Sequence, residues 1–209
     1  MLDFDGTDDM VQIQTLSQEF YDNMDVSCAF WMYSEGGSAE TMFHAADGGA
    51  NDFNIWVNNP DDNKIKIIVA GAEYSSGTIS KELTNSLTHV AVTVKSGGQV
   101  LLYIDGELEH THAVTADTSA FGDIDDVAFG LDYDGPTTYS NWFDGLIGQL
   151  RLYDKVLTAK NIKSLYNNPT AAGDRDVITF DENFGGTSGS AITSTDLNLN
   201  KWIKDPGED

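Results

Sequence analysis

Two acidic segments, far apart in the chain, carry the residue types that bind a hard cation. The first is the loop 47–52 (Asp-Gly-Gly-Ala-Asn-Asp), and the second is the stretch 132–134 (Asp-Tyr-Asp). Alternate residues of an extended segment point to the same side, so Asp132 and Asp134 can share one ion. Because calcium takes about six to eight oxygen ligands, the first loop would have to supply others. The predicted ligands are Asn51, Asp52, Asp132 and Asp134. The alternative is that these are ordinary turn residues on a very acidic surface.

A second candidate cation site lies where the two ends of the fold are expected to meet. Asp5, Asp8 and Asp9 stand near the start of the chain, and Asp144 stands near the end of the expected domain. A calcium ion held by Asp5 and Asp144 would tie the first strand to the last. Both residues precede a glycine, however, and Asp-Gly is common in tight turns. The turn interpretation competes with the metal interpretation and needs no ion.

Aromatic and amide side chains near these loops are suited to hold a sugar. Trp56 follows the first acidic loop, while Tyr139, Asn141 and Trp142 lie in the last connecting loop. An aromatic ring stacks on the apolar C–H face of a sugar, and amides or carboxylates bind its hydroxyl groups. The polar surroundings of Trp142 favour it over Trp56, whose ring can instead fill the core. The predicted ligand contacts are Asp47, Trp56, Tyr133, Asn141 and Trp142.

The histidines and the cysteine form no complete metal or catalytic pattern. His110 and His112 share a strand face at i, i+2, but two ligands without a third are a weak transition-metal signal. His44 and His89 are interpreted as structural residues. Cys28 is the single cysteine, which excludes an internal disulfide and predicts a small, buried apolar side chain.

Alternating apolar residues predict the strands that must position these groups. The pattern recurs in 26–33, 53–58, 64–69 and 100–104, and turns rich in Gly, Asn and Asp separate the segments. Several of these strands are apolar on both faces, as expected for two stacked sheets. The sequence therefore predicts antiparallel hairpins in two layers.

Helical patterns are confined to two stretches. Residues 158–166 have Thr158 as N-cap and apolar residues at helical spacing. The expected buried stripe is Ile162, Leu165 and Tyr166. Residues 15–23 are expected to form a turn or a short helix.

Four segments, in their order and spacing, resemble the laminin G-like and pentraxin group of concanavalin A-like domains. They are 2–13 at the start, 87–94 and 102–107 in the middle, and 142–153 near the end. Phe-Asp-Gly occurs in the first and the last, which suggests that the termini meet inside a shared sheet. The resemblance covers roughly residues 1–168. It implies an all-β, two-sheet antiparallel jelly-roll sandwich with one short C-terminal helix.

The same resemblance bears on the predicted calcium ligands. In pentraxins the loop equivalent to the first acidic segment supplies an Asp and an Asn to calcium, and Asn51 and Asp52 occupy that place in reversed order. Asp132 and Asp134 match the acidic positions of a second pentraxin stretch. Tyr133 stands where that stretch has an amide, which argues against a second calcium ion there.

The character of the chain changes after Pro169. A linker-like run is followed by a short strand pattern over 177–180 and by a stretch rich in Gly, Ser and Thr over 185–194. We therefore place the sandwich domain at 1–168 and treat 169–209 as a linker or the start of a neighbouring domain. A strand that adds to an exposed sheet edge is a further option.

The charge of the chain excludes several classes of partner. The sequence has 34 acidic and 11 basic residues, for a formal charge of −23. Nucleic acid and anionic membranes are excluded because binding phosphate requires clustered Lys and Arg. No apolar run reaches the roughly 18 residues of a membrane span, so membrane insertion is not expected. Calcium is a natural partner for this acidity, although the acidity can also serve solubility in salty surroundings.

Together these observations predict a calcium-dependent, lectin-like carbohydrate-binding module with Ca2+ as its cofactor. The expected partner is a glycan or a cell-surface polysaccharide, or else a protein. The expected setting is a secreted or cell-surface multidomain protein, such as an adhesin. The alternative is a protein-interaction or spacer module without a sugar ligand.

A third hypothesis is a glycan-cleaving enzyme of the same fold. We do not expect catalysis, for the following reasons. Related jelly-roll glycosidases use a Glu-x-Asp-x-x-Glu pattern, whereas Glu107 and Glu109 here lack the third acid. Asp123 and Asp125 could also bring two carboxylates together. Retaining chemistry needs such a pair about 5 Å apart, with one raised pKa, and the sequence gives no sign of either.

Overall fold

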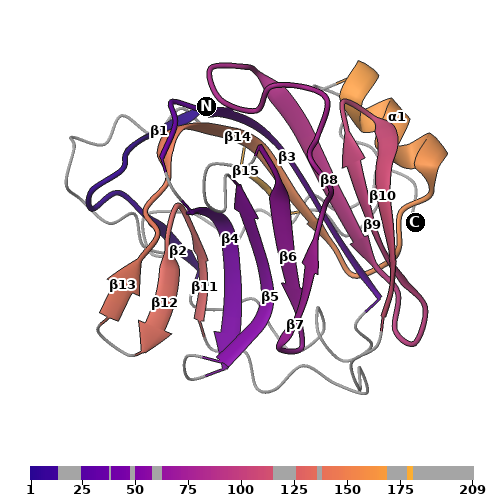
Figure 1. Ribbon diagram of the computed structural model, residues 1–209, viewed down its shortest axis with the longest axis horizontal. Helices are drawn as coiled ribbons and strands as arrows, with labels where there is room; N and C mark the ends of the chain where they lie inside the picture. Colours follow the sequence, from indigo (N-terminus) through magenta and orange to yellow (C-terminus); the bar gives the residue numbers. More distant parts are fainter. Residues whose placement is uncertain are drawn as a thin grey trace, which may run out of the picture.

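The chain folds into two stacked antiparallel sheets, a separate hairpin and a helix (Figure 1). The computed structural model describes residues 1–13, 25–37, 39–47, 50–57, 63–114, 126–135, 138–168 and 178–180. Sheet A contains, in spatial order, β1 (Leu2–Asp5), β14 (Asp144–Tyr153), β3 (Val26–Ser34), β8 (Thr88–Val94), β9 (Gln99–Ile104) and β10 (Glu107–Ala113). Sheet B contains β2 (Val11–Ile13), β11 (Asp126–Phe129), β4 (Glu40–Asp47), β5 (Ala50–Val57), β6 (Ile65–Val69) and β7 (Ala72–Ser75). The hairpin pairs β12 (Asp132–Gly135) with β13 (Thr138–Ser140), and the helix α1 spans Ala159–Asn167.

The core lies between the two sheets and follows from the alternation in the sequence. Successive side chains of a strand point to opposite faces, so one set from each sheet meets in the middle. In β5 the inward set is Phe53, Ile55 and Val57, all fully buried. Cys28 of β3 joins the same core, and burial raises the pKa of its thiol. The all-β, two-sheet jelly-roll architecture with a short C-terminal helix is thereby confirmed.

The two ends of the sandwich meet in sheet A, as the Phe-Asp-Gly turns predict. Strand β1 pairs antiparallel with β14, and Asp5 lies directly opposite Asp144. The backbone N–H of Gly6 donates to the carbonyl of Phe143 at 3.1 Å. Gly145 has a φ of 136°, and a Cβ at this position would lie 2.0 Å from the carbonyl oxygen of Tyr33. Only glycine allows β14 to approach β3 this closely.

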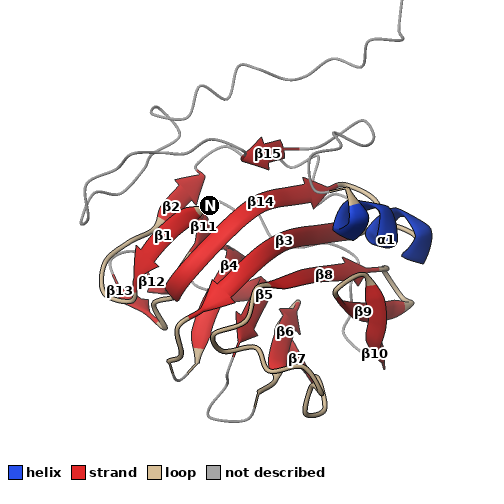
Figure 2. Ribbon diagram, turned by 90° about the horizontal axis from the view of Figure 1, so that it is seen from above, coloured by secondary structure: helices blue, strands red, loops and turns tan. Residues whose placement is uncertain are grey.

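Helix α1 covers part of the outer face of sheet A (Figure 2). Thr158 is the N-cap, as expected from the sequence, and it forms a capping box with Asn161. Ile162 and Leu165 are buried, and they pack on side chains of sheet A such as Ala29, Ala91 and Tyr103. Tyr166 differs from the expected stripe.

Tyr166 is only half-buried, and its ring stacks on Trp31 of β3 at a centroid distance of 5.6 Å. It lies near the C-terminal end of α1, beyond the apolar cluster that holds the rest of the helix. The helical pattern therefore predicted correctly that Tyr166 lies on the face of α1 that is turned to sheet A. It did not predict how much of the ring is exposed.

The segment after α1 contributes a further strand to sheet A. Strand β15 (Ile178–Phe180) pairs antiparallel with β14, with Phe180 opposite Leu150. The edge-strand option for 177–180 is the one observed, whereas the domain boundary at 168 stays a prediction. The expected turn or helix at 15–23 lies outside the described residues. None of the helices in the described ranges has the length and apolarity needed to span a membrane.

Candidate functional site

The β12–β13 hairpin is attached to sheet B by a tight reversal after β11. Gly130 has a φ of 87°, and a Cβ there would lie 2.4 Å from the ring of Phe4, so the turn requires glycine. The backbone N–H of Phe143 donates to the carbonyl of Gly130 at 2.8 Å. Leu131 is buried against Ala128 on the outer face of sheet B, the face turned away from sheet A. These contacts fix where β12 begins.

Asp132, the first residue of β12, is the centre of a buried polar cluster. Its side chain is only 2% exposed. Oδ1 lies 2.7 Å from Nδ1 of His44 and accepts a hydrogen bond from Nδ2 of Asn54 at 3.2 Å, while Oδ2 accepts one from Nδ2 of Asn141 at 3.4 Å. A buried carboxylate is costly unless polar groups compensate it, and here three elements supply them. The cluster thereby joins the hairpin to β4, β5 and the loop after β13.

The predicted calcium ligands divide into two groups in the structure. Asp132 turns its carboxylate toward sheet B, a neighbourhood that the sequence did not predict. The side chains of Asn51, Asp52 and Asp134 lie outside the described part of the structure. Their backbones are described: Asn51 lies opposite Ala46 in the β4–β5 hairpin. Strand β12 runs in the same direction as β4 (Figure 1), so the chain passes from Asp132 toward that hairpin. A calcium site there stays a prediction.

Trp56 belongs to the outer face of sheet B rather than to the core, which holds its neighbours Ile55 and Val57. It alternates with the core residues of β5, lies directly opposite Thr41 of β4 and Lys66 of β6, and is half-buried. The ammonium of Lys66 lies 3.7 Å from the centroid of the Trp56 ring and 3.6 Å from Oε1 of Glu73. One face of Trp56 is thus covered by a cation.

The other predicted ligand contacts gather around the β12–β13 hairpin. Trp142 is half-buried against the Ala128–Leu131 cluster, and its ring lies 6.0 Å from that of Tyr139. Tyr139 is exposed, and the amide of Asn141 is directed to Asp132. The side chains of Asp47 and Tyr133 lie outside the described residues.

At the junction of the termini, the structure gathers the predicted acidic residues. One carboxylate oxygen from each of Asp5, Asp8 and Asp9 lies within 4.8 Å of the others. The backbone N–H of Thr7 donates to Oδ1 of Asp5 at 2.9 Å, which is the hydrogen bond of an Asx turn. A Cβ at Gly6 would lie 3.0 Å from Cβ of Asp144, so the fourth acid is adjacent. The turn is therefore present, and the metal role stays a prediction.

Sequence reasoning missed a second buried carboxylate, Glu40. It is 1% exposed; Oε2 accepts from Oγ of Ser34 at 2.7 Å and Oε1 from the backbone N–H of Asp144 at 3.1 Å. It thereby links β4 to two strands of sheet A. His44 and Asn54 were also missed as partners of Asp132. Both sit between apolar residues on neighbouring strands, and this repeated polar interruption was the available signal.

The paired histidines, and the acidic residues considered for catalysis, lie outside the Asp132 cluster. His110 accepts from the backbone N–H of Gly77 through Nε2 at 3.0 Å, and its Nδ1 lies 3.1 Å from the carbonyl of Glu109. Burial lowers the pKa of His112, and His110 adds to the shift. Because both nitrogens of His110 are engaged, this pair does not offer two free metal ligands. Glu107 pairs with Lys163 of α1, and 123 and 125 lie outside the described residues.

Comparison with known proteins agrees with this architecture. Residues 5–163 match the family described as the concanavalin A-like lectin/glucanases superfamily. No curated protein matches the chain. A heptameric SAP-like pentraxin from Limulus polyphemus has 15% identity and a TM-score of 0.59, with 77% of this chain and 81% of that chain covered.

Two domains that were solved with bound oligosaccharides have similar structures. Domain 4 of an extracellular arabinanase from Geobacillus stearothermophilus, in complex with arabinotriose, has 23% identity and a TM-score of 0.54, with 69% of this chain and 68% of that chain covered. The CBM40 domain of an IT-sialidase from Ruminococcus gnavus, bound to α2,3 sialyllactose, has 16% identity and a TM-score of 0.58, with coverage of 69% and 83%. At these identities the structural likeness concerns the fold alone. Since the family match spans well over half of the sequence, the chain belongs to the concanavalin A-like lectin/glucanase superfamily.

Proposed function

We propose that this chain is a calcium-dependent carbohydrate-binding module of a larger secreted or cell-surface protein. The glycan is held on the outer face of sheet B and at its β4–β5 rim. The observation that carries the proposal is the polar cluster of Asp132 with His44, Asn54 and Asn141 on that face. The corresponding face of sheet A is instead partly covered by α1.

The polar cluster supports binding because it holds the β12–β13 hairpin in one position before a ligand arrives. Preorganised loops lose little freedom on binding, and more of the contact energy then appears as affinity. The face also has aromatic rings for stacking on a sugar, in Trp56, Tyr139 and Trp142. Similar domains from other proteins were solved with arabinotriose and sialyllactose, which supports a glycan by analogy.

Calcium is proposed at two places. At the rim, the oxygen ligands would come from Asn51, Asp52 and Asp134. Asp132 precedes Asp134 by two residues in β12. At the junction of the termini, the three clustered carboxylates of Asp5, Asp8 and Asp9 repel one another, and a cation would relieve this repulsion. With Asp144, a calcium ion there would stabilise the pairing of β1 with β14.

A glycan array in calcium and in chelator, combined with calorimetric calcium titration, tests the function. Sugar binding is expected in calcium and is expected to be lost in chelator. The Asp132→Ala, Asp134→Ala double variant is expected to lose the rim ion, and the Asp5→Ala, Asp144→Ala variant the junction ion. Glu82→Ala removes an exposed carboxylate outside both clusters and serves as the matched control.

The two parts of the proposal fail separately. A silent array under both conditions contradicts carbohydrate binding and favours the protein-interaction or spacer module. Sugar binding that persists in chelator contradicts the calcium dependence alone. Antibody detection of the protein on intact cells or in the culture medium tests the extracellular placement.

A further inference from the structure

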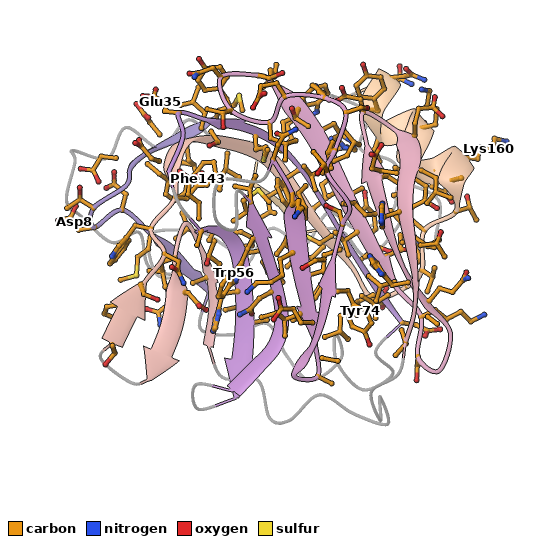
Figure 3. The ribbon with its side chains drawn as sticks, viewed as in Figure 1. Asp8, Glu35, Trp56, Tyr74, Phe143 and Lys160 are labelled. Carbon is orange, nitrogen blue, oxygen red and sulfur yellow. The ribbon has the colours of Figure 1, made fainter. Side chains whose placement is uncertain are left out.

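Three side chains form a row across the middle of sheet B, on its outer face. Thr41 of β4, Trp56 of β5 and Lys66 of β6 are consecutive cross-strand neighbours. Directly opposite residues of antiparallel strands share one face, so all three point away from the core. Figure 3 labels Trp56, the central member, on the sheet that contains β4, β5 and β6. The row lies beside the Asp132 cluster, because the backbone N–H of Thr41 donates to the carbonyl of Asn141 at 2.8 Å.

Two side-chain polar atoms of this row have no hydrogen-bond partner among the described residues. Nε1 of Trp56 and Oγ1 of Thr41 are buried, and within the described part of the chain neither has a hydrogen-bond partner. Buried polar groups are nearly always paired in folded proteins, so each exception needs an explanation. Two such atoms lie in directly opposite positions, and a ligand would satisfy them only after displacing the side chains that cover them.

The ammonium of Lys66 is also weakly paired. Its side chain is almost buried, yet the described residues offer its ammonium only the Trp56 ring and Oε1 of Glu73, at 3.6 Å. That distance is longer than a hydrogen bond. Glu73 is largely exposed and can move away, because its carboxylate is readily solvated. The ammonium of Lys66 can therefore exchange the carboxylate of Glu73 for a stronger acceptor.

We infer that this row binds the carboxylate of an acidic saccharide, such as a uronic acid. The inference rests on the proposed function, since it names the ligand class of the same face. An indole N–H and an ammonium only donate, so their ligand must be rich in acceptors. A carboxylate meets this need with charge-assisted hydrogen bonds, whereas a neutral sugar also needs acceptors from the protein. The half-buried Trp56 ring gives the sugar a surface beside that contact.

The charge of the whole chain restricts the ligand further. A formal charge of −23 repels any anion, but exposed charges are screened beyond about 8 Å at physiological salt. One carboxylate can be held at short range by Lys66, while a polyanionic chain would place further charges against the acidic surface. The ligand is therefore a saccharide with an isolated carboxylate rather than a uniformly charged polymer.

Calorimetric titration with galacturonic acid and with galactose tests the inference, because the two sugars differ only at C6. The parent protein is expected to bind galacturonic acid at least about tenfold more tightly. Lys66→Met keeps the aliphatic stem, and Trp56→Phe keeps a ring without the N–H; both are expected to lose this preference. Lys160→Met removes a lysine on α1, far from Trp56 in Figure 3, and is expected to keep it.

Each outcome separates the inference from the proposed function. Equal binding of the two sugars, or a preference that survives in folded Lys66→Met protein, overturns the inference. If Lys66→Met protein binds neutral glycans in a calcium-dependent way, as the parent does, the proposed function is supported and the inference about acidic saccharides is contradicted. Preference for the acid that persists in chelator supports direct recognition by Lys66 rather than recognition through calcium. Urea unfolding of each variant verifies that it is folded.

Discussion

At the scale of single residues, buried polar side chains do most of the positioning in this protein. Asp132 and Glu40 are carboxylates with almost no exposure, and each accepts hydrogen bonds from more than one element. Such groups stabilise a fold only when their partners are in place, and they destabilise it when a partner is removed. They therefore make the arrangement of the hairpin and of the sheet ends specific.

His89 predicts a pH dependence of stability. It is 2% exposed; burial lowers its pKa from 6.5 to about 4, with Asp105 opposing the shift and Arg151 adding to it. Between these two values the unfolded chain binds a proton that the folded chain does not. Stability is therefore lost as the pH falls from about 6.5 toward 4, by up to about 3 kcal/mol.

Urea unfolding at pH 7 and at pH 4.5 measures this contribution. In His89→Gln protein the loss of unfolding free energy between the two pH values is expected to be about 2 kcal/mol smaller than in the parent. Comparing the two proteins cancels the carboxylates that titrate in the same range. An identical loss in both would mean that His89 is protonated without cost in the folded state.

At the scale of elements, sheet A depends on what α1 and β14 contribute to it. Strand β14 pairs with β1 and β15 along one edge and with β3 along the other, and a bulge between Gly148 and Arg151 separates its two halves. The helix then packs its apolar residues on the outer face of the same sheet. Because a helix of this length is marginal alone, its packing and its cap must act together.

The cap of α1 gives a prediction at this scale. Thr158→Ala removes the hydroxyl that accepts from the backbone N–H of Asn161, and about 1 kcal/mol of unfolding free energy is expected to be lost. Thr158→Ser keeps the hydroxyl and is expected to stay within a few tenths of the parent. Denaturant unfolding measures both. Equal losses in the two variants would assign the effect to the threonine methyl group instead of the cap.

At the scale of the whole molecule, the excess of acidic residues sets the conditions for stability and binding. The 34 acidic side chains outnumber the basic ones by 23, so the folded chain repels itself at low ionic strength. The ion pairs among the described residues, such as Lys81 with Asp105 at 2.5 Å, offset only a small part of this.

Salt is therefore expected to stabilise the fold. Raising NaCl from about 10 mM to 0.5 M should raise Tm by roughly 5 °C, because the Debye length shrinks from about 30 Å to under 10 Å. Calcium chloride at matched ionic strength should raise Tm further, since a bound ion stabilises only the folded state. Scanning calorimetry measures both changes. A Tm that does not respond to NaCl contradicts self-repulsion, and equal effects of the two salts contradict specific calcium binding.

The sequence predicted more of the elements than of the candidate site. Strands, turns and the capped helix follow from short-range alternation and local hydrogen bonds, so the pairing of β1 with β14 and the helix after Thr158 were accessible. The partners of Asp132 were not. Asn54 lies 78 positions away in the chain, and only the folded hairpin brings the two together.

What the sequence alone determined is a strongly acidic, all-β sandwich of the concanavalin A-like type with a short helix on one sheet. The tertiary structure decided which side chains meet on the outer face of the other sheet. The reason is register: an irregularity between Thr41 and Phe43 in β4 sets Thr41 opposite Trp56 while Phe43 still enters the core. A shift of one residue reverses every side chain beyond it, and the alternation pattern does not specify where such a shift falls.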